Sequence, residues 1–194
     1  MEYAKMRAIA EELARYARRL EGSWSVEIGP AGPVLAMVHL PERHEETVRS
    51  IRGQLNEQLP ASLPGHVCVR RPRVEHPATG RLRCADAVVV PDDAFDGRRF
   101  AADASQALAA IEIVSSSNPD NDYRDKLADY PAMGIAHYLI VDPRTGTIDA
   151  HSDLSDGRYR SKESYIYGDR VPLGPWAVET GDFRRYERAG GRSE

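Results

Sequence analysis

Apolar residues recur at helical spacing in two segments of the first third of the chain. In residues 2–20 they fall three or four positions apart with charged residues between them, which predicts an amphipathic helix. Residues 42–59 repeat this spacing before Pro60 and predict a second helix. Between them, short apolar runs at 24–28 and 34–38 flank a turn rich in glycine and proline, which is typical of two strands.

The middle of the chain carries longer apolar runs. Residues 85–90, 108–114 and 137–141 are almost continuously apolar, as strands covered on both faces are, whereas 122–133 is helical in pattern. The run at 147–150 follows a turn and is expected to return antiparallel to 137–141. A strand–helix–strand core among antiparallel strands predicts an α/β fold (α+β mixed), with a mixed sheet flanked by helices.

Charge excludes one broad class of function. The chain holds 26 Lys and Arg against 30 Asp and Glu, a net charge of −4, which argues against a protein that coats nucleic acid by charge alone. Residues 67–84 nevertheless predict an arginine-rich hairpin that turns at 77–80. Its arginines are candidates for contacts with DNA phosphates, and a merely solvated hairpin is the alternative. These arginines are Arg70, Arg71, Arg73, Arg81 and Arg83.

Length and composition predict a single domain over residues 1–187, with a disordered tail at 188–194. No apolar stretch approaches the length of a membrane span, and the two cysteines lack the spacing of a metal knuckle. Phosphate-binding glycine loops, a serine-nucleophile elbow and paired metal-binding histidines are all absent from the sequence. We therefore expect a cytoplasmic protein with no membrane partner.

Two acids within apolar strands and one lysine carry the remaining chemical signal. Glu112 lies between two isoleucines. Burying an unpaired carboxylate there would cost several kcal/mol of folding free energy, so we expect a cation or a metal beside it. Asp86 opens the run 87–90 and raises the same question, with a hydrated strand start as the alternative. Two such carboxylates supply hard oxygen ligands for Mg²⁺ or Mn²⁺. Lys126 is one of only three lysines; a solvated helix lysine is the alternative.

Four segments together resemble a known family. The sequences ADAVVV at 85–90, IEIVSSS at 111–117, DYRDKLADY at 122–130 and GIAHYLIVDP at 134–143 are similar, in this order, to the Uma-type restriction endonucleases. That family belongs to the PD-(D/E)XK nuclease superfamily, and its lysine has moved from the second strand to the following helix. The resemblance is good over 84–143 and implies a restriction-endonuclease-like core.

The resemblance also implies roles for individual residues. Asp86 and Glu112 would bind a divalent Mg or Mn ion, with the main-chain carbonyl of Ile113 as a further ligand. Lys126 would be the catalytic lysine. These assignments agree with the chemistry expected of buried acids beside a lysine.

Four further positions match the family more loosely. Glu27 and His44 correspond to an acid in an early strand and a histidine that opens the next helix. The alternatives are an acid at the rim of the site for Glu27 and a surface residue for His44. Tyr130 and Asp142 also match, but we interpret them as structural, because Tyr130 packs the helix and Asp142 begins a turn that contains proline.

The implied function is a divalent-metal-dependent endonuclease that hydrolyses DNA phosphodiester bonds. A homodimer would suit two nicks in a duplex. Pro131 departs from the family pattern and is expected to kink or end the helix about one turn beyond Lys126. Because that could move the lysine, the alternative is a catalytically silent binding or accessory module of nuclease fold.

Overall fold

The computed structural model describes residues 2–38, 41–96 and 99–186, so the predicted tail at 188–194 lies outside the described residues. The helices are α1 (Tyr3–Ala17), α2 (Glu42–Ser62) and α3 (Leu127–Ala132), with a π-helical segment η4 (Asn121–Lys126) and short 3₁₀ turns η1 (Pro77–Thr79) and η3 (Ala104–Gln106). The strands are β1 (Ser23–Gly29), β2 (Gly32–Val38), β3 (His66–Arg70), β4 (Arg73–His76), β5 (Arg81–Cys84), β6 (Ala87–Pro91), β7 (Ala102–Asp103), β8 (Ala109–Ile113), β9 (His137–Asp142), β10 (Thr147–Ser155), β11 (Arg158–Ile166), β12 (Arg170–Leu173) and β13 (Trp176–Glu179). Within this part of the chain, no helix is both long enough and apolar enough to cross a membrane.

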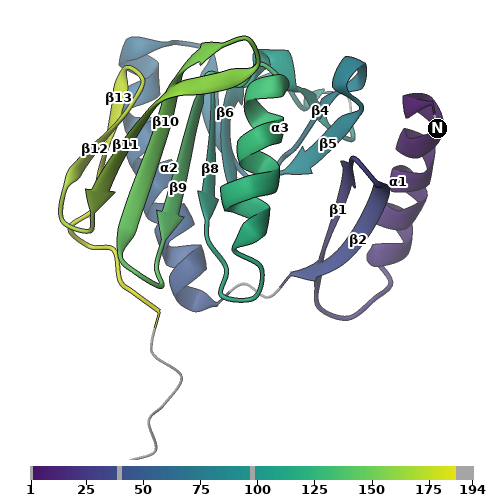
Figure 1. The fold of residues 1–194 in the computed structure, drawn as a ribbon, viewed down its shortest axis with the longest axis horizontal. Helices are drawn as coiled ribbons and strands as arrows, with labels where there is room; N and C mark the ends of the chain where they lie inside the picture. The colour runs from purple at the N-terminus through teal and green to yellow at the C-terminus, as the bar shows by residue number, and fades with distance from the viewer. Residues whose placement is uncertain (1, 39–40, 97–98, 187–194) are drawn as a thin grey trace, which may run out of the picture.

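A six-stranded mixed sheet forms the centre of the molecule, in the order β11-β10-β9-β8-β6-β3 (Figure 1). β8 and β9 run parallel, and the chain between them crosses over through η4 and α3. The other neighbours are antiparallel, including β9 and β10, as the turn after 137–141 predicts. The predicted α/β class with a mixed sheet flanked by helices is therefore confirmed.

Both faces of this sheet are covered. Ile111 and Ile113 of β8 belong to the core beneath α2, β12 and β13, whereas Ala110 belongs to the core beneath α3. All five positions of β8 are buried, as expected of an interior strand. Because side chains alternate along a strand, Glu112 lies on the α3 face with Ala110. The alternation of side chains therefore places Glu112 on the face covered by α3 and by the π-helical segment η4, which carries Lys126.

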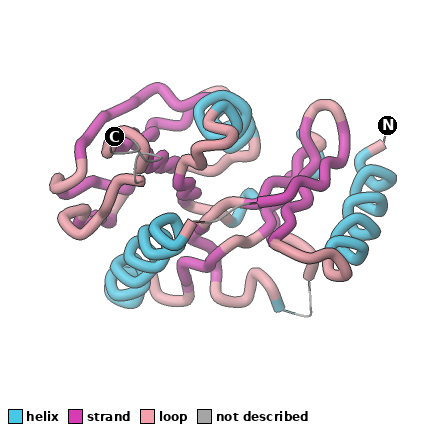
Figure 2. The backbone as a smooth tube through the Cα atoms, turned by 90° about the horizontal axis from the view of Figure 1, so that it is seen from below, coloured by secondary structure: helices cyan, strands magenta, loops and turns pink. Residues whose placement is uncertain are grey.

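A second, five-stranded sheet stands beside the first, in the order β2-β1-β5-β4-β7. Helix α1 packs against its outer side, far from β12 and β13 (Figure 2). Its buried contacts come from one face of β1, where Val26 and Ile28 meet Ala10 and Ala14 of the helix. The opposite face of the β1–β2 hairpin is thereby left to border the functional site.

The predicted hairpin at 67–84 is wrong in its first part. β3 leaves it and pairs antiparallel with β6 in the six-stranded sheet, with Arg70 opposite Ala87. The hairpin itself consists of β4 and β5 only, joined through η1 as the turn residues predict. Arg71 has a positive φ of 48° and Pro72 follows it, so the backbone changes direction between the two strands.

The helices also differ in extent from their sequence patterns. α1 ends at Ala17, before the predicted end at residue 20. α2 continues to Ser62 and includes Pro60 in its last turn, where the missing N–H removes a single bond from the end of the helix. The predicted helix 122–133 divides into the π-helical segment and α3.

A buried ion-pair network ties the five-stranded sheet to α3. Asp129 of α3 accepts hydrogen bonds of 2.8 Å from the Nε atoms of both Arg81 and Arg83 of β5. Arg83 also donates to Glu27 of β1 over 2.8 Å, and its side chain is only 7% exposed. One guanidinium therefore links a strand of the second sheet to the helix that covers the first.

Replacing Asp129 with alanine should destabilise the fold strongly. The buried charge of Arg83 would then be paired with Glu27 alone. We expect a loss of about 3 kcal/mol or more in the free energy of unfolding, measured by urea denaturation.

The matched control is Glu12→Ala, which removes the exposed partner of Arg15 in a surface pair of α1. It should cost at most about 1 kcal/mol. Equal losses in the two variants would show that the Asp129 network does not hold the fold together.

Candidate active site

Asp86 and Glu112 come together at the ends of two neighbouring strands. Asp86 directly precedes β6, and Glu112 lies in β8, which pairs antiparallel with β6. The Asp86 main-chain N–H donates to Oε2 of Glu112 over 3.3 Å, and the Ile113 N–H donates to Oδ2 of Asp86 over 2.8 Å. The ladder between the strands thus sets the two carboxylates side by side, with Asp86 the more open of the pair at 15% exposure.

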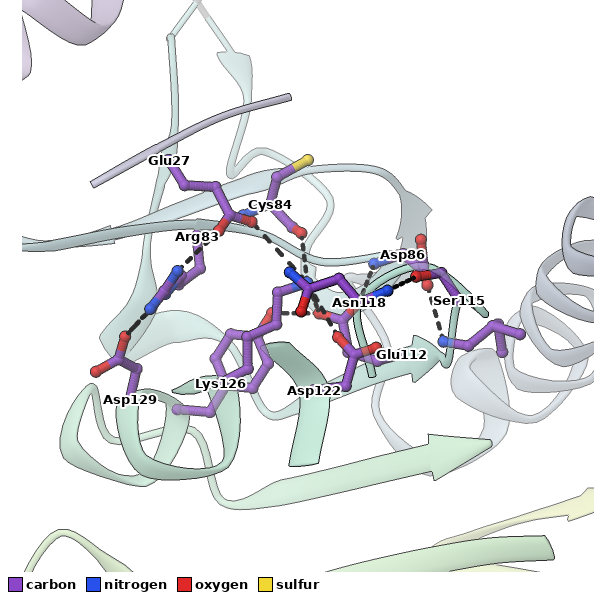
Figure 3. A network of polar contacts seen from close by, with 12 residues as sticks. Glu27, Arg83, Cys84, Asp86, Glu112, Ser115, Asn118, Asp122, Lys126 and Asp129 are labelled. Atoms are coloured by element: carbon purple, nitrogen blue, oxygen red, sulfur yellow. Dashed lines mark hydrogen bonds and ion pairs between the residues drawn. The ribbon is translucent and has the colours of Figure 1, made fainter. Parts of the chain in front are cut away.

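Lys126 points into this pair from the π-helical segment (Figure 3). Its Nζ lies 2.8 Å from Oε1 of Glu112 and 3.6 Å from Oδ1 of Asp122, one helical turn earlier. It also donates to the main-chain carbonyl of Cys84 over 3.2 Å. The side chain is 5% exposed, so the ammonium is buried next to Glu112.

Pro131 ends the helix without turning Lys126 away. It lies in the last turn of α3, which stops at Ala132, as its missing N–H predicts. The preceding residue, Tyr130, is fully buried, and its ring packs edge to face against Tyr138 at 5.0 Å, which agrees with its interpretation as a packing residue. Its hydroxyl also donates to Oε1 of Glu112, so the packing residue is a direct partner of the acid.

Excess negative charge surrounds the lysine. Burial raises the pKa of Glu112 well above its usual range; Lys126 opposes this rise, and the nearby carboxylates of Asp86 and Asp122 add to it. Burial likewise raises the pKa of Asp122 to about 6, against the attraction of Lys126 and with the repulsion of Asp86 and Glu27. Burial alone would lower the pKa of Lys126, but the surrounding carboxylates, Glu112 first, raise it well above its usual range. The ammonium of Lys126 therefore stays charged. Its single positive charge does not balance the carboxylates around it.

His44 and Glu27, the two loosely matched positions, both reach the site. His44, in the first turn of α2, lies with Nε2 3.1 Å from Oδ1 of Asp86 and is 3% exposed. Burial acts to raise the pKa of Asp86, but the His44 hydrogen bond and the charge of Lys126 outweigh it and lower that pKa. Glu27 accepts from the Cys84 N–H over 3.0 Å and lies 3.9 Å from Nζ of Lys126. Neither side chain is a detached surface group.

The five arginines predicted as a DNA-binding arm do not share one surface. Arg81 and Arg83 take part in the buried ion-pair network. Arg70 belongs to the other sheet and pairs with a glutamate of α2. Arg73 lies over an aromatic ring at 4.6 Å, and burial lowers its pKa. Arg71 lines the cavity of the site.

A cavity of about 380 Å³ contains this chemistry. Its floor is formed by Asp86, Glu112, Asp122 and Lys126, and its wall by the β1–β2 hairpin. It therefore lies between the two sheets.

The donor set fits a hard divalent cation. Among residues 2–38, 41–96 and 99–186, no three His, Cys, Asp or Glu side chains converge as a metal centre. The expected ligand set needs only two carboxylates and a main-chain carbonyl, and Asp86, Glu112 and Ile113 all line the cavity. Burial first, and neighbouring carboxylates after it, raise the pKa values of Glu112 and Asp122, whereas the nearby positive charge of Lys126 lowers both.

Two contributors are missing from the sequence prediction. Asp122 lies four residues before Lys126, a spacing that places both on one side of a helical turn, and this was the available signal. The Cys84 carbonyl left no signal, because a main-chain acceptor carries no residue type. Asp142, predicted to begin a turn, does so: it accepts from the Arg144 N–H over 2.9 Å.

Comparison with known proteins agrees with this geometry. Residues 10–176 match the Uma2 family, described as "Putative restriction endonuclease". A solved structure from Anabaena variabilis ATCC 29413, described as "a putative nuclease belonging to DUF820", superposes with a TM-score of 0.61 at 13% identity, covering 88% of this chain and 96% of that one. No curated protein matches the sequence. The Anabaena protein shares the fold. Because the family model matches most of the chain, the chain belongs to the Uma2 family, whose description supports a nuclease.

Proposed function

We propose that the protein is a divalent-metal-dependent endonuclease that hydrolyses DNA phosphodiester bonds. One observation carries the proposal: Nζ of Lys126 lies 2.8 Å from Oε1 of Glu112. Both residues, together with Asp86, line an accessible cavity. A lysine and two acids from three separate elements meet there without being needed to fill a core. Such a constellation suits phosphoryl transfer, in which charge must be balanced around a phosphate.

The proposed metal ligands are the carboxylates of Asp86 and Glu112 and the carbonyl of Ile113. Mg²⁺ or Mn²⁺ prefers such oxygen donors. When bound, the metal would supply an activated water and stabilise charge on a phosphoryl oxygen. His44 supports this role by holding Asp86 ionised and oriented through the 3.1 Å contact.

Lys126 would supply a fixed positive charge beside the scissile phosphate. Its raised pKa keeps the ammonium protonated at neutral pH. The Cys84 carbonyl and Glu27 hold the amine in one orientation, so little reorganisation would accompany the reaction. Arg71, at the border of the cavity, is the arginine best placed to contact a neighbouring phosphate.

The first test of this proposal is Lys126→Ala. We expect plasmid cleavage in Mn²⁺ to fall by about a hundredfold or more, because a preorganised charge is lost from the transition state. Manganese binding, measured by calorimetry, should be retained, since the ammonium is not a ligand.

Lys162→Ala is the matched control, because Lys162 also pairs with an aspartate but lies on β11 and is half exposed. It should cleave like the wild type. A Lys126→Ala protein that keeps the wild-type rate would contradict the catalytic assignment. A wild type that binds manganese but cleaves neither plasmid nor single-stranded DNA would point to the silent module.

The second test concerns the metal ligands. Asp86→Asn and Glu112→Gln should each weaken manganese binding by at least about tenfold and abolish cleavage, while circular dichroism stays native. Asp125→Asn changes an exposed acid at the border of the same cavity and should leave both properties unchanged. Cleavage that persists in a chelator would refute metal dependence.

The third test uses pH in the absence of metal. The pKa of Asp122 rises from 3.8 to about 6 on folding, so its contribution to stability is full below pH 3.8 and is lost as pH rises through about 6. Asp122→Asn should remove that loss. Its free energy of unfolding, relative to the wild type, should increase between pH 4 and 6 and level off above. Parallel pH profiles for the two proteins would contradict the charge excess that favours a metal.

A further inference from the structure

The β1–β2 hairpin turns one face toward the catalytic cavity. On β1 the alternate residues Ser25 and Glu27 line it, and on β2 their partners Ala36 and Val34 do so. Val38 continues the same face. Glu27 is the charged exception on this face, and the other side chains are small or apolar. We call the apolar residues Val34, Ala36 and Val38 the wall; they face the charged floor of the cavity.

This wall is not part of the hydrophobic core. Val34 is 51% exposed, and Ala36 is exposed as well. The core of the hairpin is on its other face, where Val26 and Ile28 pack beneath α1. Apolar side chains left in water beside a functional group are typical of a ligand contact.

The wall adjoins the proposed reaction centre directly. Val34 is the cross-strand partner of Glu27, whose Oε1 lies 3.9 Å from Nζ of Lys126. Side chains paired in this way lie about 5 Å apart. One ligand that reaches both Lys126 and Val34 must therefore be polar at one end and apolar a few ångströms away.

Cationic contacts to a long stretch of backbone are scarce here. Of the described residues that line the cavity, the cations are Arg71, Arg83 and Lys126. Arg83 is bound to Glu27 and Asp129, and Lys126 to the acids of the floor. Beyond the phosphate held at the proposed metal, affinity for a ligand in the cavity would therefore come in large part from apolar contact.

A nucleotide combines a charged phosphate with a less polar sugar and base. Only an unpaired nucleotide exposes the face of its base to an apolar surface. In a duplex, stacking covers the faces of each base, and only its edges are accessible in the grooves. A nucleotide in a single strand, or one flipped out of a duplex, can place its sugar and base against an apolar surface. The cavity volume of about 380 Å³ lies within the range of about 300–1,000 Å³ found for small-ligand sites.

We propose that Val34, Ala36 and Val38 form a subsite for the sugar and base of an unpaired nucleotide whose phosphate lies at the acids and Lys126. This inference rests on the proposed nuclease function and names its substrate class: DNA with an unpaired nucleotide at the scissile position. Intact duplex is then the poorer substrate.

The test measures binding of a short fluorescent single-stranded DNA by anisotropy in Mn²⁺, over times at which a gel shows the DNA intact. Val34→Ser should weaken binding about tenfold, because one apolar contact is lost. The slope of affinity against salt should stay the same, because no phosphate contact is lost. Val34→Ile should bind like the wild type.

Ile166→Ser is the control, since Ile166 is an equally exposed apolar residue on β11. It should have no effect. The wild type should bind the single strand more tightly than the matching duplex, and an abasic nucleotide in the strand should remove the sensitivity to Val34→Ser.

Three results would overturn the subsite: tighter binding of duplex, equal behaviour of Val34→Ser and Ile166→Ser, or an effect of Val34→Ser explained by a change of oligomeric state in light scattering. The last result would make β2 an interface between copies. If the wild type cleaves no DNA while Val34→Ser still loses single-strand binding, the subsite stands and the proposed turnover fails.

Discussion

The buried ammonium of Lys126 is the interaction on which the site depends. It lies within 3.9 Å of oxygens of Glu112, Asp122 and Glu27, which come from a strand of each sheet and from its own helical segment. Hydrogen bonding within the sheets fixes the strands of Glu112 and Glu27, and Asp122 is held by the same helical segment as the lysine. The positive charge of Lys126 offsets the repulsion between these acids, but one lysine stands against several carboxylates.

Arg83 has the corresponding role one layer away. Its planar guanidinium binds Glu27 and Asp129 at once, a geometry that the point charge of a lysine does not reproduce. Glu27 is thus held between two cations, one structural and one at the floor of the cavity. The position of Lys126 is therefore set both by its own helix and, through Glu27, by the second sheet.

The sequence predicts the central fold well because its signal is local. Apolar runs and their alternation identify the strands around Glu112, including the face on which it lies, and the rarity of lysine draws attention to Lys126. The resemblance to a family brings these residues together, which periodicity alone does not. The errors arise where the signal is long-range: Arg70 pairs with another sheet, and the partners Arg83 and Asp129 are 46 residues apart. No local pattern specifies such contacts.

The floor and the wall of the cavity differ in how much they contribute to the stability of the fold. Asp86 and Glu112 each make hydrogen bonds or ion pairs with buried partners, so an exchange at either position removes contacts that the site depends on. Val34 and Ala36 are exposed, and substitutions at such positions usually change stability by less than about 0.5 kcal/mol. Sequence drift in a lineage can therefore reshape the wall of the cavity while its floor stays constant. Related proteins can therefore come to accept different ligands in the cavity while the groups that would act on the ligand stay the same.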